Sequence, residues 1–134
     1  GAALLDVPGT ARMTVDLPLV PRIYLKHREN FAVLRRSGLD WSVLCPGPLI
    51  DAPDGRATAG LILSTDTWPV PRPAIAGYLP RLASSILFAR SVPRMTICYE
   101  DAAQVIIDHL APQGRFAGHR VGIALPAGQT RKKA

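Results

Sequence analysis

Helix-like and strand-like segments alternate along the chain, and this alternation limits its fold more than any other feature. Residues 21–37 carry apolar side chains at helical spacing, and Gly38 follows them as a C-cap. Residues 41–45 then predict a short buried strand, which Pro46-Gly47-Pro48 ends because proline cannot extend a strand ladder. A chain of 134 residues built in this way predicts one α/β domain around a single core.

The remaining segments continue the alternation and complete the predicted order of elements. We expect the end of a buried strand at residues 2–5, a strand within residues 57–65, an extended proline-rich loop at 68–73, a helix over 79–90, a strand at 95–98, a helix over 100–110 and a strand at 119–125. The folded domain is expected over residues 1–126, with a disordered basic tail at 127–134.

Composition excludes several classes of protein. The net charge is +6, but the arginines are scattered singly except in two local groups, a helix face with Arg28, Arg35 and Arg36 and the tail at 131–133, so we expect no nucleic-acid partner. No uncharged stretch approaches the ~20 apolar residues that cross a bilayer, and no secretory signal opens the chain, so we expect no membrane association and a cytoplasmic protein. Cys45 and Cys98 lack the spacing of a zinc or redox pair and are expected to be inert core thiols.

Residues 29–49 closely resemble a segment of the atypical short-chain dehydrogenase/reductase superfamily, in particular its NAD(P)H-binding, NmrA-like members. In that family a helix with a Glu and a Leu-Arg pair turns through Ser-Gly-Leu-Asp into a strand ending in Arg-Pro-Gly, where this chain has Cys45 in place of the Arg. Residues 96–103 and 120–124 are similar to later elements of the family. The resemblance implies the C-terminal part of a Rossmann-like doubly wound sheet.

The resemblance also implies NAD(P)H as cofactor of the complete protein. Members of the family hold the pyrophosphate on a glycine-rich turn between a strand and a helix. None of the eleven glycines here forms such a motif. We therefore expect the chain to lack the N-terminal dinucleotide-binding βαβ unit, to bind no cofactor alone, and to self-associate or pair with a companion N-terminal segment.

Candidate catalytic residues come from the same resemblance, which implies a Tyr with a Lys four residues later. Here Tyr24 is followed by Arg28 at that distance, while Lys26 and His27 lie where the lysine is expected. Tyr24 and His27 are therefore the candidate proton-transfer residues, and Lys26 is a candidate cofactor-binding residue. The alternative is that Tyr24 and His27 are only the polar-tipped members of an apolar helix face.

The loop after the first clear strand is the second candidate part of the site. In the resembling family it passes beside the nicotinamide, which makes Cys45, Pro46, Gly47 and Pro48 candidate cofactor-binding residues. The same residues also serve simply to end the strand, and the two roles are compatible.

Other polar and aromatic residues give weaker signals. Trp68 is either a substrate lid or packed against the body of the protein. No spacing places two acidic residues convincingly with a histidine, so no metal is expected, and His109 and His119 are expected at the surface.

Two functions from different classes remain open. The first is the substrate-side part of an NAD(P)H-dependent oxidoreductase acting on a small molecule, inactive alone. The second is a non-catalytic, NmrA-like dinucleotide-sensing or interaction module. The departure from the Tyr/Lys pattern at Tyr24 and Arg28 favours the second.

Overall fold

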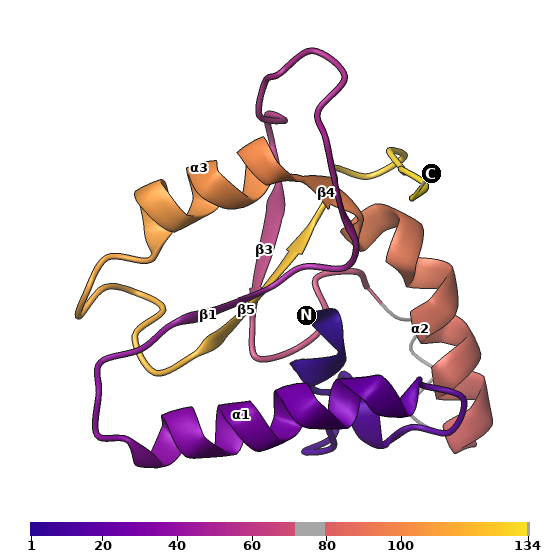
Figure 1. Ribbon diagram of the computed structural model, residues 1–134. Coiled ribbons are helices and arrows are strands. Elements are labelled where there is room, and N and C mark those ends of the chain that lie inside the picture. The colour runs from indigo at the N-terminus through magenta and orange to yellow at the C-terminus, as the bar shows by residue number, and fades with distance from the viewer. Residues whose placement is uncertain (72–79, 134) are drawn as a thin grey trace.

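The fold is α/β, as seen in a computed structural model that describes residues 1–71 and 80–133. Its elements, in chain order, are the 3-10 helices η1 (Ala2–Leu4), η2 (Thr14–Asp16) and η3 (Arg22–Tyr24), helix α1 (Leu25–Arg36), strands β1 (Val43–Cys45), β2 (Leu49–Ile50) and β3 (Ile62–Thr65), helix α2 (Arg81–Met95), strand β4 (Ile97–Cys98), helix α3 (Tyr99–His109) and strand β5 (Arg120–Ala124). Helices lie on either side of the strands (Figure 1).

The larger sheet is mixed and has the strand order β1-β5-β3. Strand β1 runs parallel to β5, with Leu44 opposite Val121, whereas β3 runs antiparallel to β5, with Leu63 opposite Ile123. Strands β2 and β4 form a separate parallel pair. All five residues of β5 are buried, which is expected for a strand with a neighbour on each edge and packing on each face.

Two apolar clusters cover opposite faces of this sheet, because successive strand side chains point to opposite sides. On one face Cys45 and Ala124 pack with Phe31 of α1 and Met95 of α2. On the other face the cluster contains Ile123 of β5 and Val105 of α3, with other strand side chains packed against them. The arrangement is therefore three-layered, with α1 below the strands and α3 above them in Figure 1.

The prediction of a strand end at residues 2–5 is wrong. Ala2–Leu4 form η1, although Leu5 and these residues are buried as expected of an apolar run. A short run of consecutive apolar residues does not distinguish a strand from a turn of helix by its periodicity. The turn is fixed instead by tertiary contact, since the Ala2 amide donates to the Pro46 carbonyl at 2.7 Å.

The other expected elements are present, with shifted ends. The helix at 21–37 is η3 with α1, and the strands at 41–45, 57–65 and 119–125 are shortened to β1, β3 and β5. Helix α2 continues through Pro93 to Met95, beyond the end expected at residue 90, and so shortens the strand expected at 95–98. Local proline rules are outweighed here by packing, because Met95 is fully buried in the core.

Three expectations concern the ends of segments or of the chain. The expected start of the second helix at Leu79 and the end of the proline-rich loop at residues 72–73 lie outside the described residues. In the basic tail, which extends to Lys133 in the described chain, the Arg131 guanidinium contacts the Asp101 carboxylate.

None of the helices formed by residues 1–71 and 80–133 is long and apolar enough to span a bilayer.

Candidate functional site

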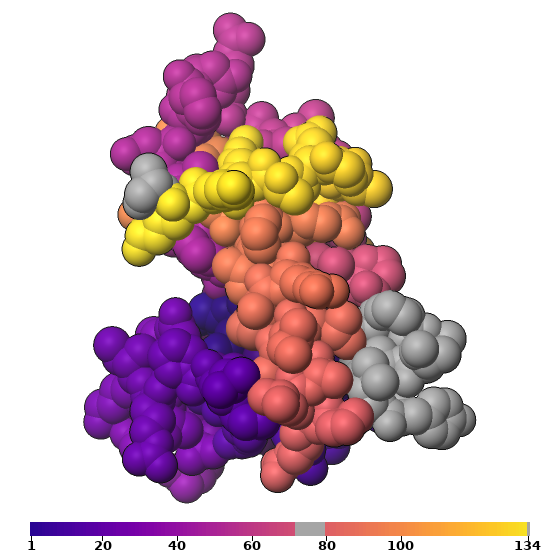
Figure 2. All heavy atoms as spheres, turned by 90° about the vertical axis from the view of Figure 1, so that its right-hand side faces the viewer, coloured from indigo at the N-terminus to yellow at the C-terminus, as the bar shows by residue number. Residues whose placement is uncertain are grey.

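A hollow of about 200 Å³ lies where the chain leaves the carboxyl end of β1. Its walls come from residues 1–3, the loop 46–48, Tyr24, two apolar residues of α2 and Lys133. In Figure 2 the indigo N-terminal residues are recessed there, between the purple α1 region and orange α2, with the yellow C-terminal tail above them. We call this cavity the Tyr24 hollow.

The loop 46–48 is held tightly against α2. The Gly47 amide donates to the Met95 carbonyl at 3.0 Å, and a Cβ on Gly47 would lie 2.8 Å from the same oxygen. Only glycine allows this close approach without displacing backbone. The Pro46 carbonyl accepts from Ala2, so both sides of the loop are fixed, and the loop forms a rigid wall of the hollow.

A second hollow, of about 270 Å³, adjoins the first. It lies between residues 19–21 and α2 and shares Tyr24, Phe88 and Val92 with the Tyr24 hollow. Tyr24 therefore stands between two apolar chambers, with 37% of its surface exposed.

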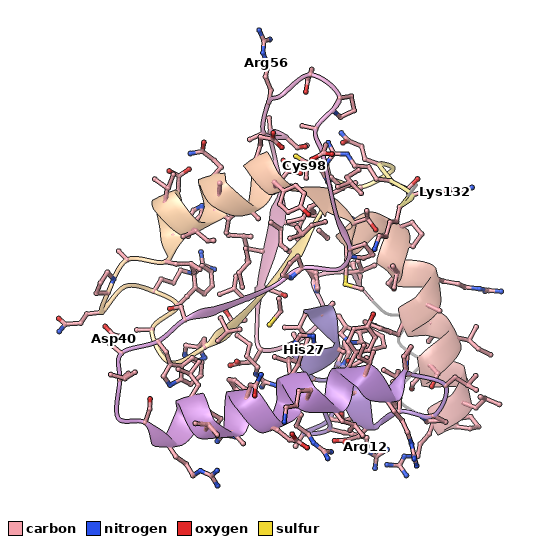
Figure 3. All side chains as sticks on the ribbon, in the orientation of Figure 1. Arg12, His27, Asp40, Arg56, Cys98 and Lys132 are labelled. Atoms are coloured by element: carbon pink, nitrogen blue, oxygen red, sulfur yellow. The ribbon has the colours of Figure 1, made fainter. Side chains whose placement is uncertain are left out.

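Tyr24 and His27 are brought together as the sequence predicted, because they lie on adjacent turns of η3 and α1. Their rings stack, with centroids 5.9 Å apart and planes inclined by 23°. Figure 3 labels His27 on the first turn of α1. Neither side chain forms a hydrogen bond or ion pair with another described residue, but only Tyr24 lines the two hollows, and His27 reaches them through its stack on Tyr24.

The predicted cofactor-binding Lys26 is not brought to this hollow. Its ammonium pairs with Glu29 at 2.9 Å on the outer face of α1, where the Lys26 side chain is 76% exposed. Arg28 is also committed, since it forms an ion pair with Asp16. The lysine that does line the hollow is Lys133, which the sequence places in the predicted disordered tail.

Cys45 is adjacent to the loop but lines neither hollow. It is fully buried, its thiol donates a weak hydrogen bond to the Val43 carbonyl at 3.5 Å, and burial raises its pKa to about 11. A thiol in this state is neither a nucleophile nor a ligand. Cys98, the other thiol predicted to be inert and in the core, is also buried, and its pKa is raised chiefly by burial.

An ion-pair network, which we call the Arg120 network, joins Asp6, Asp66, His119 and Arg120. The Arg120 guanidinium is bidentate on Asp6, with both N–O distances 2.9 Å, and its Nε donates to Asp66 at 3.3 Å. His119 Nδ1 lies 2.7 Å from the second Asp66 oxygen. Arg120 is 9% exposed and stands 5.4 Å from the centre of the Phe31 ring.

The charge of Asp66 is stabilised by this network. Burial opposes ionisation, but hydrogen bonds from the Arg120 amide and from His119, with the nearby guanidinium, outweigh it and lower the pKa of Asp66. The pairing of one carboxylate, Asp66, with His119 was not predicted from the sequence. They are 53 residues apart in sequence, and only the pairing of β3 with β5 brings them together.

A second network of hydrogen bonds and an ion pair, which we call the Asp101 network, surrounds the completely buried side chain of Asp101. It accepts from the Thr58 amide at 2.6 Å and the Cys98 amide at 3.0 Å, and pairs with Arg131 at 2.7 Å. Burial opposes the charge, but these partners outweigh it and lower the pKa of Asp101 to about 2. The acidic start of α3 thus joins three segments of the chain as well as complementing the helix dipole.

Trp68 is packed against the body, which is the second of the two roles considered for it. It is 4% exposed, and its Nε1 donates to Thr14 Oγ1 at 2.6 Å. Within the part of the chain that the structure describes, no three His, Cys, Asp or Glu side chains cluster in a way that would hold a metal ion.

Comparison with known proteins adds nothing to this geometry, since no family model, no curated protein and no solved structure matches the chain.

Proposed function

We propose that the chain forms the substrate-side wall of an NAD(P)H-dependent oxidoreductase of the atypical short-chain type. One observation carries the proposal: Tyr24 and the loop 46–48, which the resemblance implicates separately, line a single hollow at the carboxyl end of a parallel strand. In α/β sheets, ligands collect at the carboxyl ends of strands. The proposal thus rests on a convergence of residues that sequence alone could not establish.

The chain's own part in such a reaction is to bind and orient the substrate and to hold a proton. The apolar walls exclude water, and the Tyr24 hydroxyl, free of internal partners, is the group that donates a proton at the hollow, with His27 stacked beside it. In the complete protein NAD(P)H supplies the hydride.

The pyrophosphate of the cofactor does not fit the N-terminus of α3, the described helix that directly follows a strand. Such a group needs free backbone amides at a helix N-terminus. At α3, which follows β4 directly, the Asp101 carboxylate already occupies the cap by accepting from the Cys98 amide. We therefore include in the proposal a companion segment, or further residues of the gene product, that bind the pyrophosphate.

A dinucleotide-sensing module without turnover is the second candidate, and one observation favours it. Both cations near Tyr24 on α1 are neutralised, Lys26 by Glu29 and Arg28 by Asp16, so neither is free to acidify the phenol. A binding site lacking that activation retains affinity without an efficient proton donor.

Titration of NADPH and NADH against this chain and against the complete gene product, followed by turnover assays with quinones and carbonyl compounds, separates these readings. We expect binding and turnover by the complete product only. Tyr24→Phe and His27→Ala should abolish turnover, while Tyr99→Phe and His109→Ala, on α3, serve as matched controls. Binding without turnover supports the sensor, whereas an absence of dinucleotide binding by the complete product overturns both candidates.

A further inference from the structure

The polar side chains on the wall of the Tyr24 hollow have no hydrogen-bond or ion-pair partner among the described residues. Apart from the chain terminus at Gly1, the hollow's polar side chains are those of Tyr24 and Lys133, and the remaining walls are apolar. Among residues 1–71 and 80–133, no carboxylate lines the hollow or its neighbour. An apolar cavity with an unmatched cation at its edge is complementary to an apolar molecule that carries a negative charge.

Like most lysines and arginines of the described chain, Lys133 has no carboxylate partner, but it is the one whose side chain lines the Tyr24 hollow. Lys26, Arg28, Arg120 and Arg131 are each paired with a carboxylate of the chain. Lys133 forms no ion pair with any other described residue, although its neighbour Arg131 is anchored on Asp101. The anchor keeps the tail over the hollow and leaves the Lys133 ammonium for an external anion.

The size and walls of the hollow limit the ligand further. A volume of about 200 Å³ is below the roughly 300–1,000 Å³ of sites for drug-sized molecules, so the ligand has one or two rings. Aromatic side chains at Tyr24 and Phe88, with prolines at 46 and 48, provide flat surfaces against which a ring packs.

We propose that the Tyr24 hollow binds a small aromatic carboxylate, with its ring on the apolar walls and its carboxylate paired with Lys133. The role of this molecule as a substrate rests on the proposed function, whereas the binding itself does not. Charge pairing with a flexible lysine selects for the anion, and the apolar walls select for the ring.

Isothermal titration with naphthalene-2-carboxylate, and with the uncharged naphthalene-2-carboxamide as matched probe, tests the proposal on the chain as it is. We expect the carboxylate to bind about fivefold more tightly than the amide, as is usual for one partly exposed ion pair. Lys133→Gln should remove this difference by weakening carboxylate binding alone. Lys132→Gln, which changes the adjacent lysine outside the hollow, should leave it intact.

Three results would overturn the inference: no binding of either probe, equal affinity for both, or equal losses from the two lysine substitutions. The titration contains no dinucleotide, so its outcome is separable from that of the proposed function. Carboxylate binding in a gene product that binds no dinucleotide would overturn the function alone. Dinucleotide turnover by a protein that does not discriminate the two probes would overturn this inference alone.

Discussion

The Arg120 network and the Tyr24 hollow both bring together polar side chains from distant segments, but they leave those side chains in opposite states. In the network, Arg120 has carboxylate or carbonyl partners at Asp6, Asp66 and Leu4. In the hollow, the Tyr24 hydroxyl and the Lys133 ammonium have none among the described residues. Polar groups that neutralise one another hold segments together, whereas groups left without partners are available to a ligand.

The comparison also explains why a histidine beside a carboxylate is not the better candidate for chemistry. His119 and Asp66 form the kind of pair that orients a catalytic base. Here, however, Asp66 is shared with Arg120, and neither described hollow includes His119. We therefore propose a structural role for Asp66 and His119 and a functional role for Tyr24 and His27, and substitutions in the two regions test this proposal.

The largest effect is expected from Arg120→Met. Removing the guanidinium leaves Asp6 and Asp66 without their shared counter-charge, at 23% and 34% side-chain exposure, so we expect a loss of about 3 kcal/mol in the free energy of unfolding. Urea denaturation measures it. Arg12→Gln, at an exposed arginine that Figure 3 labels at the edge of the molecule, is the control and should change stability by less than about 0.5 kcal/mol. Equal changes in unfolding free energy for Arg120→Met and Arg12→Gln would show that the Arg120 network stabilises the fold no more than an exposed arginine does.

A smaller effect on the free energy of unfolding, dependent on pH, is expected from Asp101→Asn. The pKa of Asp101 is lowered from 3.8 to about 2, which corresponds to about 2 kcal/mol of stability. Because the folded-state pKa is the lower one, this stability is present above pH 3.8 and is lost as the pH falls towards 2. The difference in unfolding free energy between wild type and Asp101→Asn should therefore narrow between pH 5 and pH 2, whereas Asp51→Asn, in an exposed loop, should give no such narrowing.

Gly47→Ala is expected to lower the free energy of unfolding by about 1 to 2 kcal/mol. The added Cβ would lie 2.8 Å from the Met95 carbonyl oxygen and must displace backbone. Gly1→Ala is the matched control in the same hollow, since its Cβ meets only the Pro46 oxygen at an ordinary 3.5 Å. Thermal unfolding compares them. Equal stability of the two variants would show that the loop 46–48 is not the rigid wall described above.

The smallest effect on stability is expected from Tyr24→Phe, because its hydroxyl has no partner to lose. The free energy of unfolding should stay within about 0.5 kcal/mol of wild type. The same substitution is expected to abolish the turnover that the proposed function implies. A decrease in the free energy of unfolding above about 1 kcal/mol would mean that the Tyr24 hydroxyl stabilises the fold, as the Arg120 guanidinium does.

The alternation of elements was predictable because helix and strand periodicities are local, as residues 21–37 and 41–45 illustrate. Residues 2–5 were misassigned because a short apolar run carries no periodicity, and the hydrogen bond to Pro46 that fixes the turn lies far away in sequence. The pairing of Asp66 with His119 and the approach of Lys133 to Tyr24 depend on strand pairing and on the Arg131 anchor. No sequence pattern reports such contacts. The proximity of Tyr24 and His27 could be predicted from the sequence, because it follows from their helical spacing.

The central claim, that unpartnered side chains mark the ligand site, is tested most directly by nuclear magnetic resonance. Amide spectra of the ¹⁵N-labelled chain would be recorded during titration with naphthalene-2-carboxylate. We expect the shift changes to concentrate on the amides of Ala2, Ala3, Tyr24, His27 and Gly47, and to spare those of Asp6, Asp66 and Arg120. Changes centred on the Arg120 network, or spread evenly over the basic surface, would contradict the account.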